Sequence, residues 1–137
     1  MILAMIIRSA TPDDIPAMLG LWRQFWKAQP CESNLPRKIG QEPDLVVVAE
    51  DGGRIVGTVI GGFDLWWAWI YRVAVDRACQ KKGVGTSLLT EIQKRFKARG
   101  IDGAGLIVSP ENESMQALLR KFGCREHADR HYGIRFR

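Results

Sequence analysis

The chain has 137 residues, and 46% of them are hydrophobic, which suffices to bury roughly two thirds of the unfolded surface in one core. We therefore expect a single domain over residues 1–137. No apolar run approaches the ~20 residues that cross a bilayer, and residues 1–7 lack the basic region and cleavage site of a signal peptide. We expect a cytoplasmic protein with no membrane partner.

The formal net charge of +5 raises the alternative of a nucleic-acid-binding protein. However, lysines and arginines are interleaved with acids, as in residues 91–99 and 111–126, and no recognised nucleic-acid motif occurs. We therefore interpret the positive charge as a solvated surface and expect no nucleic-acid partner.

Cysteines and histidines give no sign of a disulfide framework or a metal centre. Cys31, Cys79 and Cys124 are odd in number and far apart, so we expect free thiols. His127 and His131 lie four residues apart, but their segment is predicted to be a hairpin rather than a helix. No metal site is therefore predicted.

The N-terminal third predicts a strand, a helix and an irregular connection. Residues 2–8 read as a strand, and Thr11 then resembles an N-cap with Pro12 at the first helical position. The helix is expected to run to about Trp26. Residues 28–42 contain prolines and glycine and predict a loop or a short helix.

The middle of the chain predicts three strands. Two apolar runs, 46–50 and 55–62, are joined by Asp51-Gly52-Gly53, which is typical of a hairpin turn. Residues 62–67 predict another turn. Residues 70–75 are rich in β-branched and aromatic side chains and predict the third of these strands.

A glycine-punctuated turn, Gln80-Lys81-Lys82-Gly83-Val84-Gly85, follows this strand and leads into a helix. Unpaired N–H groups at a helix N-terminus bind phosphate, and glycine lets a phosphate approach the backbone. A dinucleotide fingerprint is excluded because Leu88 stands where it needs its third glycine, and a P-loop is excluded because Thr86 follows Gly85 directly. The turn therefore fits a pyrophosphate-containing ligand of another kind.

The remaining residues predict a helix, a strand, a second helix and a hairpin. The helix after the turn is expected to stop at Gly100, and residues 104–108 predict a buried strand. A further helix opens near Pro110 and ends at Gly123. Residues 125–137 predict a closing hairpin.

The turn matches the pattern Gln/Arg-x-x-Gly-x-Gly/Ala in full and resembles the acetyl-CoA pyrophosphate loop of the GNAT N-acetyltransferase superfamily. The order and spacing of the predicted elements extend this resemblance over nearly the whole chain. Residues 57–64 and 126–129 resemble small bacterial YpeA-type members. The resemblance implies an α/β GNAT fold: a mixed, mostly antiparallel central sheet of six to seven strands, with helices on both faces and a bulge that splays the fourth and fifth strands into a V.

The resemblance also implies acetyl-CoA as cosubstrate. Backbone groups of Val73 and Val75 would pair with the pantetheine amides, and the Val73 N–H would polarise the thioester carbonyl. Asn112 matches a family asparagine, with helix capping as the open alternative. The residues implied to bind the cofactor are Val73, Ala74, Val75, Gln80, Lys81, Lys82, Gly83, Val84, Gly85, Thr86, Asn112 and Leu119.

The clearest departure from the family is Leu119, which stands where a tyrosine usually protonates the departing thiolate. A leucine cannot donate a proton, so water, another donor or weakened catalysis remain as alternatives. Tyr71 precedes Val73 by two residues, and strand alternation would put both on one face, which makes Tyr71 a candidate acid with packing as the alternative. Asp64 or Glu50 is a candidate general base. The predicted catalytic residues are Tyr71, Asp64 and Val73.

We expect acetyl transfer from acetyl-CoA to a primary amine of a small molecule, peptide or protein by direct attack. The alternative is a non-catalytic acyl-CoA-binding or regulatory module, which the missing tyrosine motivates. Trp22, Trp26 and residues 31–37 are candidates for the acceptor side. The neighbours Trp66 and Trp67 cannot both point inward from a regular strand, so one of them is expected to face solvent, an acceptor or another subunit, which leaves a homodimer open.

Overall fold

The structure, a computed structural model, describes residues 5–136. The chain divides into two compact units, the first ending at Ile107 and the second beginning at Val108, and each is described by itself. The single domain expected over residues 1–137 therefore stays a prediction.

A mixed sheet forms the centre of the first unit. Its strands are β1 (Met5–Ser9), β2 (Val46–Asp51), β3 (Arg54–Phe63), β4 (Ala68–Val75) and β5 (Gly105–Leu106). They are ordered β1-β2-β3-β4-β5, with antiparallel pairing up to β4 and parallel pairing between β4 and β5. The mixed, mostly antiparallel sheet is confirmed, whereas the predicted first strand began at residues 2–4, which lie outside the described part.

The predicted strand count is wrong for the described residues, because their sheet has five strands rather than six or seven. The closing hairpin expected over 125–137 is absent from residues 125–136, which form no strand. Its apolar residues Tyr132, Ile134 and Phe136 are 83%, 85% and 88% exposed. Alternating apolar residues specify a strand only where a sheet edge and an apolar face receive them.

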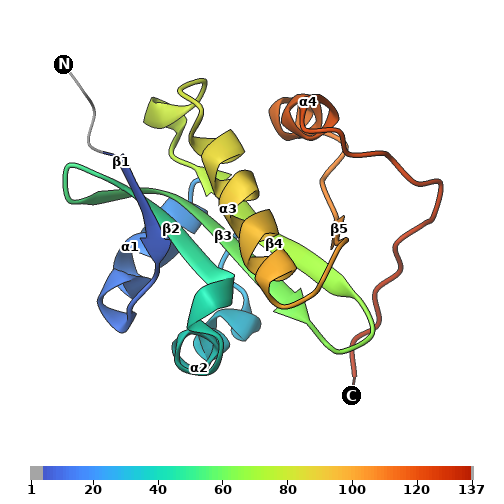
Figure 1. Cartoon of the computed structure of the whole chain (residues 1–137), viewed down its shortest axis with the longest axis horizontal. Coiled ribbons are helices and arrows are strands. Elements are labelled where there is room, and N and C mark those ends of the chain that lie inside the picture. The colour runs from blue at the N-terminus through green and yellow to red at the C-terminus, as the bar shows by residue number, and fades with distance from the viewer. Residues whose placement is uncertain (1–4, 137) are drawn as a thin grey trace. The chain divides into compact units, whose positions relative to one another are not determined.

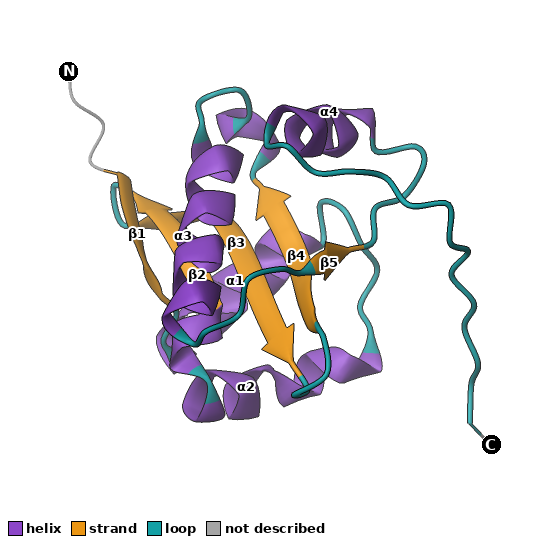
Figure 2. Ribbon diagram, turned by 45° about the vertical axis from the view of Figure 1, so that its right-hand side comes forward, coloured by secondary structure: helices purple, strands orange, loops and turns teal. Residues whose placement is uncertain are grey.

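Helices cover both faces of the sheet, as predicted. Val47 and Ala49 pack in one apolar cluster with residues of α3 (Val84–Ala98). Val46 and Val48 pack in the other with residues of α1 (Ile15–Trp22) and α2 (Leu35–Gln41). Because side chains alternate along β2, a single strand supplies both clusters, and the two groups of helices lie on opposite sides of it (Figures 1 and 2).

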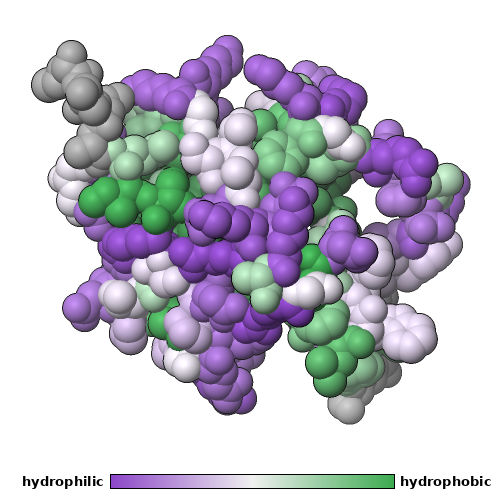
Figure 3. Space-filling model, in the orientation of Figure 1, coloured by the Kyte–Doolittle hydropathy of each residue, from purple (hydrophilic) through white to green (hydrophobic). Residues whose placement is uncertain are grey.

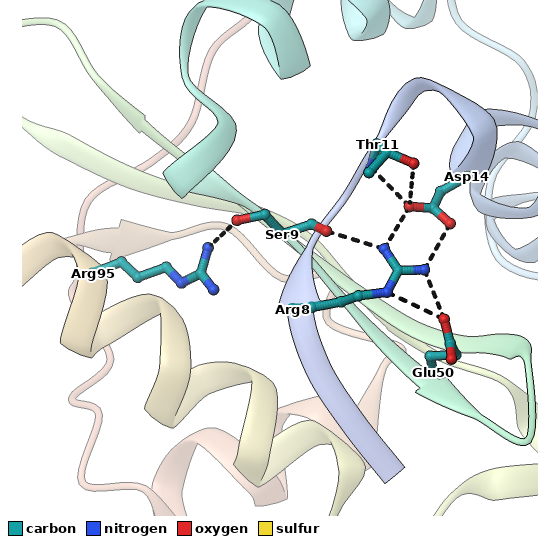
Figure 4. Close-up of polar contacts among 6 residues, drawn as sticks. All are labelled: Arg8, Ser9, Thr11, Asp14, Glu50 and Arg95. Carbon is teal, nitrogen blue, oxygen red and sulfur yellow. Dashed lines mark hydrogen bonds and ion pairs between the residues drawn. The ribbon is translucent and has the colours of Figure 1, made fainter.

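The start of α1 is fixed by an ion-pair cluster, shown in Figure 4. The Arg8 guanidinium donates to both oxygens of Asp14, at 2.7 and 2.9 Å, and to Glu50 at 2.8 Å. Asp14 also accepts from the Thr11 N–H at 2.7 Å, which is the reciprocal half of a capping box. Thr11 and Pro12 thus begin a helical segment as predicted, but residues Pro12–Asp14 form a 3₁₀ turn and the α-helix begins only at Ile15. It ends at Trp22 and continues only as a turn, four residues earlier than expected.

The other helix boundaries agree closely with the sequence pattern. After α3 the chain turns at Gly100, whose φ of +81° is a conformation that favours glycine. The second unit contains α4 (Glu113–Lys121), followed by Gly123 at φ +93°.

In the described part of the chain, no helix is long and apolar enough to span a membrane. Figure 3 shows the apolar areas of one face as separate regions among hydrophilic ones, one of them over β1, where Ile6 is half-exposed.

Candidate active site

A β-bulge interrupts β4. On β3, Thr58 and Ile60 are two residues apart, but their partners Ala74 and Tyr71 are three apart, so β4 carries one extra residue. Arg72 lies within this bulge with φ +51°, a left-handed conformation that costs a non-glycine residue about 1–2 kcal/mol. The bulge redirects the backbone immediately before Val73.

The strand beyond the bulge has an open edge. In the described part of the chain, β4 pairs with β5 only at Trp69 with Gly105 and at Ile70 with Leu106. The two strands point in diverging directions past this pair (Figure 2). The Val75 carbonyl accepts from the Gln80 side chain, and the other outward-facing backbone groups of residues 71–75 are available to pair with an extended ligand, in the manner of an added strand.

The turn from β4 into α3 places a helix N-terminus beyond the end of this edge. Asp76 opens a 3₁₀ turn (Arg77–Cys79) by accepting from the Ala78 N–H at 3.0 Å, and Gln80 donates to the Val75 carbonyl at 3.3 Å. Gly83 precedes α3 with φ +82°, and no atom lies within 4 Å of where its Cβ would be. The first N–H groups of α3 have no partner within the helix, so the turn suits a phosphate group.

The side chains of this turn divide into exposed and buried positions. Lys81, Lys82 and Thr86 are exposed, and Val84 and Gly85 are buried. Val84 packs in the same apolar cluster as Leu88 and Ile92 of α3. Val84 and Gly85 could therefore contact a pyrophosphate only through backbone N–H groups, whereas the two lysines offer mobile positive charges.

The bulge is tied to the core by side chains that the sequence analysis missed. The hydroxyl of Thr58, which is fully buried, donates to the Arg72 carbonyl at 2.8 Å and accepts from Trp22 Nε1 at 2.9 Å. A threonine within the apolar run 55–60 was the available signal, because a buried hydroxyl requires hydrogen-bond partners. Trp22 is itself buried, which removes it from the acceptor side where it was predicted.

Tyr71 does not share a face with Val73, so that prediction is wrong. Val73 packs with the cluster on the α3 side, and a Cβ on Gly61 would meet Phe96 of α3. A Cβ on Gly62, which points to the opposite face, would lie 2.9 Å from the Tyr71 ring. The extra residue in the bulge shifts the alternation by one position. Tyr71 is 49% exposed, and partial burial, with the charge of Asp64, raises its pKa.

The two candidate bases lie elsewhere. Asp64 caps the β3–β4 turn by accepting from the N–H groups of Trp66 and Trp67, both at 2.9 Å, and these bonds lower its pKa. Its backbone N–H meets the Trp67 carbonyl, six residues before Val73, or roughly 20 Å along an extended strand. Glu50 is paired with Arg8.

The aromatic residues expected on the acceptor side take different positions. Trp66 is 91% exposed and Trp67 46%, which confirms that the pair cannot both point inward. Trp26 is partly buried, and its ring lies 4.5 Å from the Arg72 guanidinium carbon. Within residues 31–37, Glu32 pairs with Arg23, which lowers its pKa.

In the second unit, Asn112 caps α4. Its Oδ1 accepts from the Met115 N–H at 3.1 Å, so the capping alternative is confirmed, while a cofactor contact stays a prediction. Leu119 is partly buried, as are the other members of its apolar stripe, Met115, Leu118 and Phe122.

The described residues outside this region offer cysteines, a cavity and no metal-binding cluster. Across residues 5–136, no group of three or more His, Cys, Asp or Glu residues is placed to hold a metal ion. Cys31, Cys79 and Cys124 are free thiols. A cavity of about 370 Å³ opens beside the Arg8 cluster, and none of the residues predicted to bind the cofactor lines it.

Comparison with known proteins shows the family to which the chain belongs. The profile of the Acetyltransferase (GNAT) family matches residues 15–124. An acetyltransferase of Pectobacterium atrosepticum is 32% identical over 120 residues, covering 85% of each chain, and one of Photorhabdus laumondii is 32% identical over 130 residues, covering 93% of this chain and 89% of that protein. The chain belongs to the GNAT family and is an acetyltransferase.

Solved structures agree with this fold. An aminoglycoside N-acetyltransferase, AAC(6')-Iy in complex with CoA, superimposes with a TM-score of 0.81 at 21% identity, over all of this chain and 97% of that one. The ribosomal-protein-S18-alanine N-acetyltransferase of Escherichia coli superimposes with a TM-score of 0.74 at 23% identity, over 87% of this chain and 76% of that one. At these identities the likeness shows the fold alone.

Proposed function

We propose that the protein transfers the acetyl group of acetyl-CoA to a primary amine by direct attack. One observation carries the proposal: the open edge of β4 leads from the bulge at Arg72 to the N-terminus of α3 within a single unit. An extended ligand with a pyrophosphate at one end and a thioester at the other would fit this path.

The cofactor end of the path is the turn before α3. The pyrophosphate would accept from the backbone N–H groups of residues 83–86, because Gly83 keeps the space beside them open. Lys81 and Lys82 would add positive charge. Asn112 and Leu119 enter the proposal through the family pattern only, as residues on the pantetheine side.

The pantetheine arm would pair with β4 beyond the bulge. Because the backbone N–H and C=O groups of successive strand residues point in alternate directions, those of Val73 and Val75, on either side of Ala74, would hydrogen-bond its amides as a neighbouring strand does. The side chains of Val73 and Val75 pack toward α3, so only their backbone groups would face the ligand. Bound acetyl-CoA supplies an activated acyl group in the form of a thioester.

The reacting carbonyl would lie at Val73. Its N–H would donate to the carbonyl oxygen and stabilise the negative charge that develops during attack; loss of one such donor typically costs about 10²–10³-fold in kcat. The amine nitrogen forms a bond to the carbonyl carbon, the C–S bond breaks, and the thiolate takes a proton. Tyr71 adjoins the bulge and is the proposed donor, with Asp64 receiving the proton of the amine through water.

The acceptor is proposed to be a small amine or the amine of a peptide. We also propose a place among the small bacterial YpeA-type members, on the likeness of residues 57–64 and 126–129. The fold neighbours named above acetylate an aminoglycoside and a ribosomal protein, which motivates testing both amino sugars and peptides rather than choosing between them.

Mass spectrometry of acetylated products tests the proposal. Thiol reagents are unsuitable because Cys31 and Cys124 are exposed. Purified protein is incubated with acetyl-CoA and a panel of alkylamines, amino sugars and peptides, with the matching alcohols as controls. We expect acetylation of an amine but not of its alcohol. Coenzyme A binding without turnover on any amine would contradict the proposal and favour a non-catalytic module.

Two double charge-reversal variants test whether the lysines of the turn act locally or only through the net charge of the protein. Lys81→Glu with Lys82→Glu should weaken acetyl-CoA binding by at least about 10-fold, because both exposed charges belong to the turn proposed to bind the pyrophosphate. Lys94→Glu with Lys97→Glu makes the same change of charge farther along α3 and should leave the affinity nearly unchanged. Equal losses in both variants would contradict the assigned site.

A further inference from the structure

Arg72 combines an unfavourable backbone conformation with an unusually enclosed side chain. Its φ of +51° occurs in the middle of a strand, at the one extra residue of the bulge. Its side chain is only 17% exposed, although arginine is normally a surface residue. A strained conformation of this kind persists only where its surroundings hold it.

Two tryptophans and two polar side chains hold the Arg72 guanidinium. Its central carbon lies 4.5 Å from the centre of the Trp26 ring and 5.4 Å from that of Trp22. Nη2 donates to Gln29 at 3.1 Å and lies 3.9 Å from Oε2 of Glu32. That Glu32 oxygen is buried and accepts no hydrogen bond within residues 5–136, so Arg72 is a second cation beside this carboxylate, whose other oxygen is paired with Arg23.

Trp22 also holds the backbone of Arg72, through the side chain of Thr58. Trp22 donates to Thr58, and Thr58 donates to the Arg72 carbonyl at 2.8 Å. The carbonyl of Arg72 and the N–H of Val73 belong to one rigid peptide group. Whatever fixes the orientation of the Arg72 carbonyl therefore also fixes the direction of the Val73 N–H.

We propose that Arg72 is a positioning residue: packing of its guanidinium against the rings of Trp22 and Trp26 keeps the bulge in its left-handed form, so that the Val73 N–H faces the reacting carbonyl. This inference rests on the proposed function of Val73. It extends that function by linking the loop after α1, through Gln29 and Glu32, to the group that polarises the thioester.

A comparison of two substitutions tests the inference. In Arg72→Ala the side chain that anchors the bulge is lost and φ should become negative, because alanine disfavours the left-handed region. In Arg72→Gly the side chain is lost as well, but glycine adopts positive φ freely. We expect kcat to fall about 10²-fold in the alanine variant, as for a lost oxyanion donor, and to stay markedly higher in the glycine variant, with smaller changes in KM.

Two further variants locate the effect. Trp26→Leu removes a stacking surface without altering β4 and should lower kcat in the same direction as Arg72→Ala. Arg99→Ala removes an arginine that pairs with Asp44 and Glu42 near the end of α3, and it should leave kcat unchanged. A similar loss of kcat in Arg99→Ala would attribute the effect to general destabilisation and overturn the inference.

A nuclear magnetic resonance readout separates this inference from the proposed function. Backbone scalar couplings that report φ at residue 72 should show the left-handed form in the wild type and in Arg72→Gly, and its loss in Arg72→Ala, whether or not any amine is acetylated. An alanine variant that keeps positive φ and full kcat overturns the inference. A glycine variant that keeps positive φ but loses as much kcat as alanine also overturns it, because Arg72 would then contact the substrate directly.

Discussion

Replacing Gly57 with alanine tests the close packing that places the cofactor turn. Gly57 is buried in β3, opposite Val75 of β4, and faces the start of α3. A Cβ there would lie 2.8 Å from Leu88 Cδ1, 3.0 Å from Val84 Cγ1 and 3.2 Å from the carbonyl oxygen of Ala74. Ordinary contacts of this kind are about 3.5–4.0 Å, so the first turns of α3 must move away from the sheet.

The expected loss of stability follows from these overlaps. Overpacking of a filled core destabilises the folded state by about 1–3 kcal/mol. Alanine also restricts the unfolded chain more than glycine does, which offsets about 0.4–1 kcal/mol of this loss. The net loss of about 1–2 kcal/mol corresponds to a fall in Tm of roughly 3–10 °C for a chain of this length. Because Val84 directly follows Gly83, the shift should also displace the N–H groups that are proposed to bind the pyrophosphate, and weaken coenzyme A binding about 10-fold or more.

Gly61 provides the matched control. A Cβ on Gly61 would lie 2.7 Å from Phe96 Cζ and 3.1 Å from Ile92 Cδ1, in the later turns of α3. Gly61→Ala should therefore lower Tm by a similar amount while leaving coenzyme A affinity nearly unchanged, as measured by calorimetry. The reasoning is refuted if Gly57→Ala keeps the wild-type Tm, or if both variants lose affinity equally.

Three further predictions concern single side chains. Tyr71→Phe should lower kcat about 10²-fold with little change in acetyl-CoA affinity, since it removes only the proposed proton donor; an unchanged kcat, measured where chemistry limits turnover, would leave water as the donor. Leu119→Ala should lower the free energy of unfolding by about 1–3 kcal/mol, less than for a fully buried leucine; an unaltered urea midpoint would contradict a packing role. The Arg8 guanidinium holds the pKa of Asp14 below its usual range, so Asp14 contributes stability above its unfolded pKa of about 3.9 that is lost as pH falls through the lower folded value. Asp14→Asn should therefore be less stable than the wild type at neutral pH, with a gap that narrows in strong acid; a gap independent of pH would contradict this assignment.

The turn and the helix that are proposed to bind the cofactor could be predicted because they are local. A glycine-containing turn, a helical period after it and a glycine at the helix end involve neighbours in sequence, and Gly83, α3 and Gly100 lie as expected. The prediction of a closing hairpin was wrong because a strand there depends on a partner that is distant in sequence. The alternation of Tyr132, Ile134 and Phe136 describes a surface that a strand could bury, but it does not supply the partner edge.

The chemistry around the bulge depends on contacts between distant segments. The family resemblance implied a bulge, but alternation was still counted straight through it, which put Tyr71 on the wrong face. Nothing local to Arg72 marks its positive φ, because that conformation is held by Trp22 and Trp26 from another element. Thr58, a polar residue in an apolar run, was the one sequence signal that a buried hydrogen-bond network lay there.

A nuclear magnetic resonance titration with coenzyme A tests the central claim most directly, because it reports the binding position without requiring the acceptor. We expect saturable shifts of the backbone amides of Val73 and Val75 in β4 and of Gly83 and Thr86 at the start of α3, with the amides of β1 unchanged. Saturable binding that leaves these four amides unperturbed would contradict the assignment of the cofactor to the bulge and the helix N-terminus.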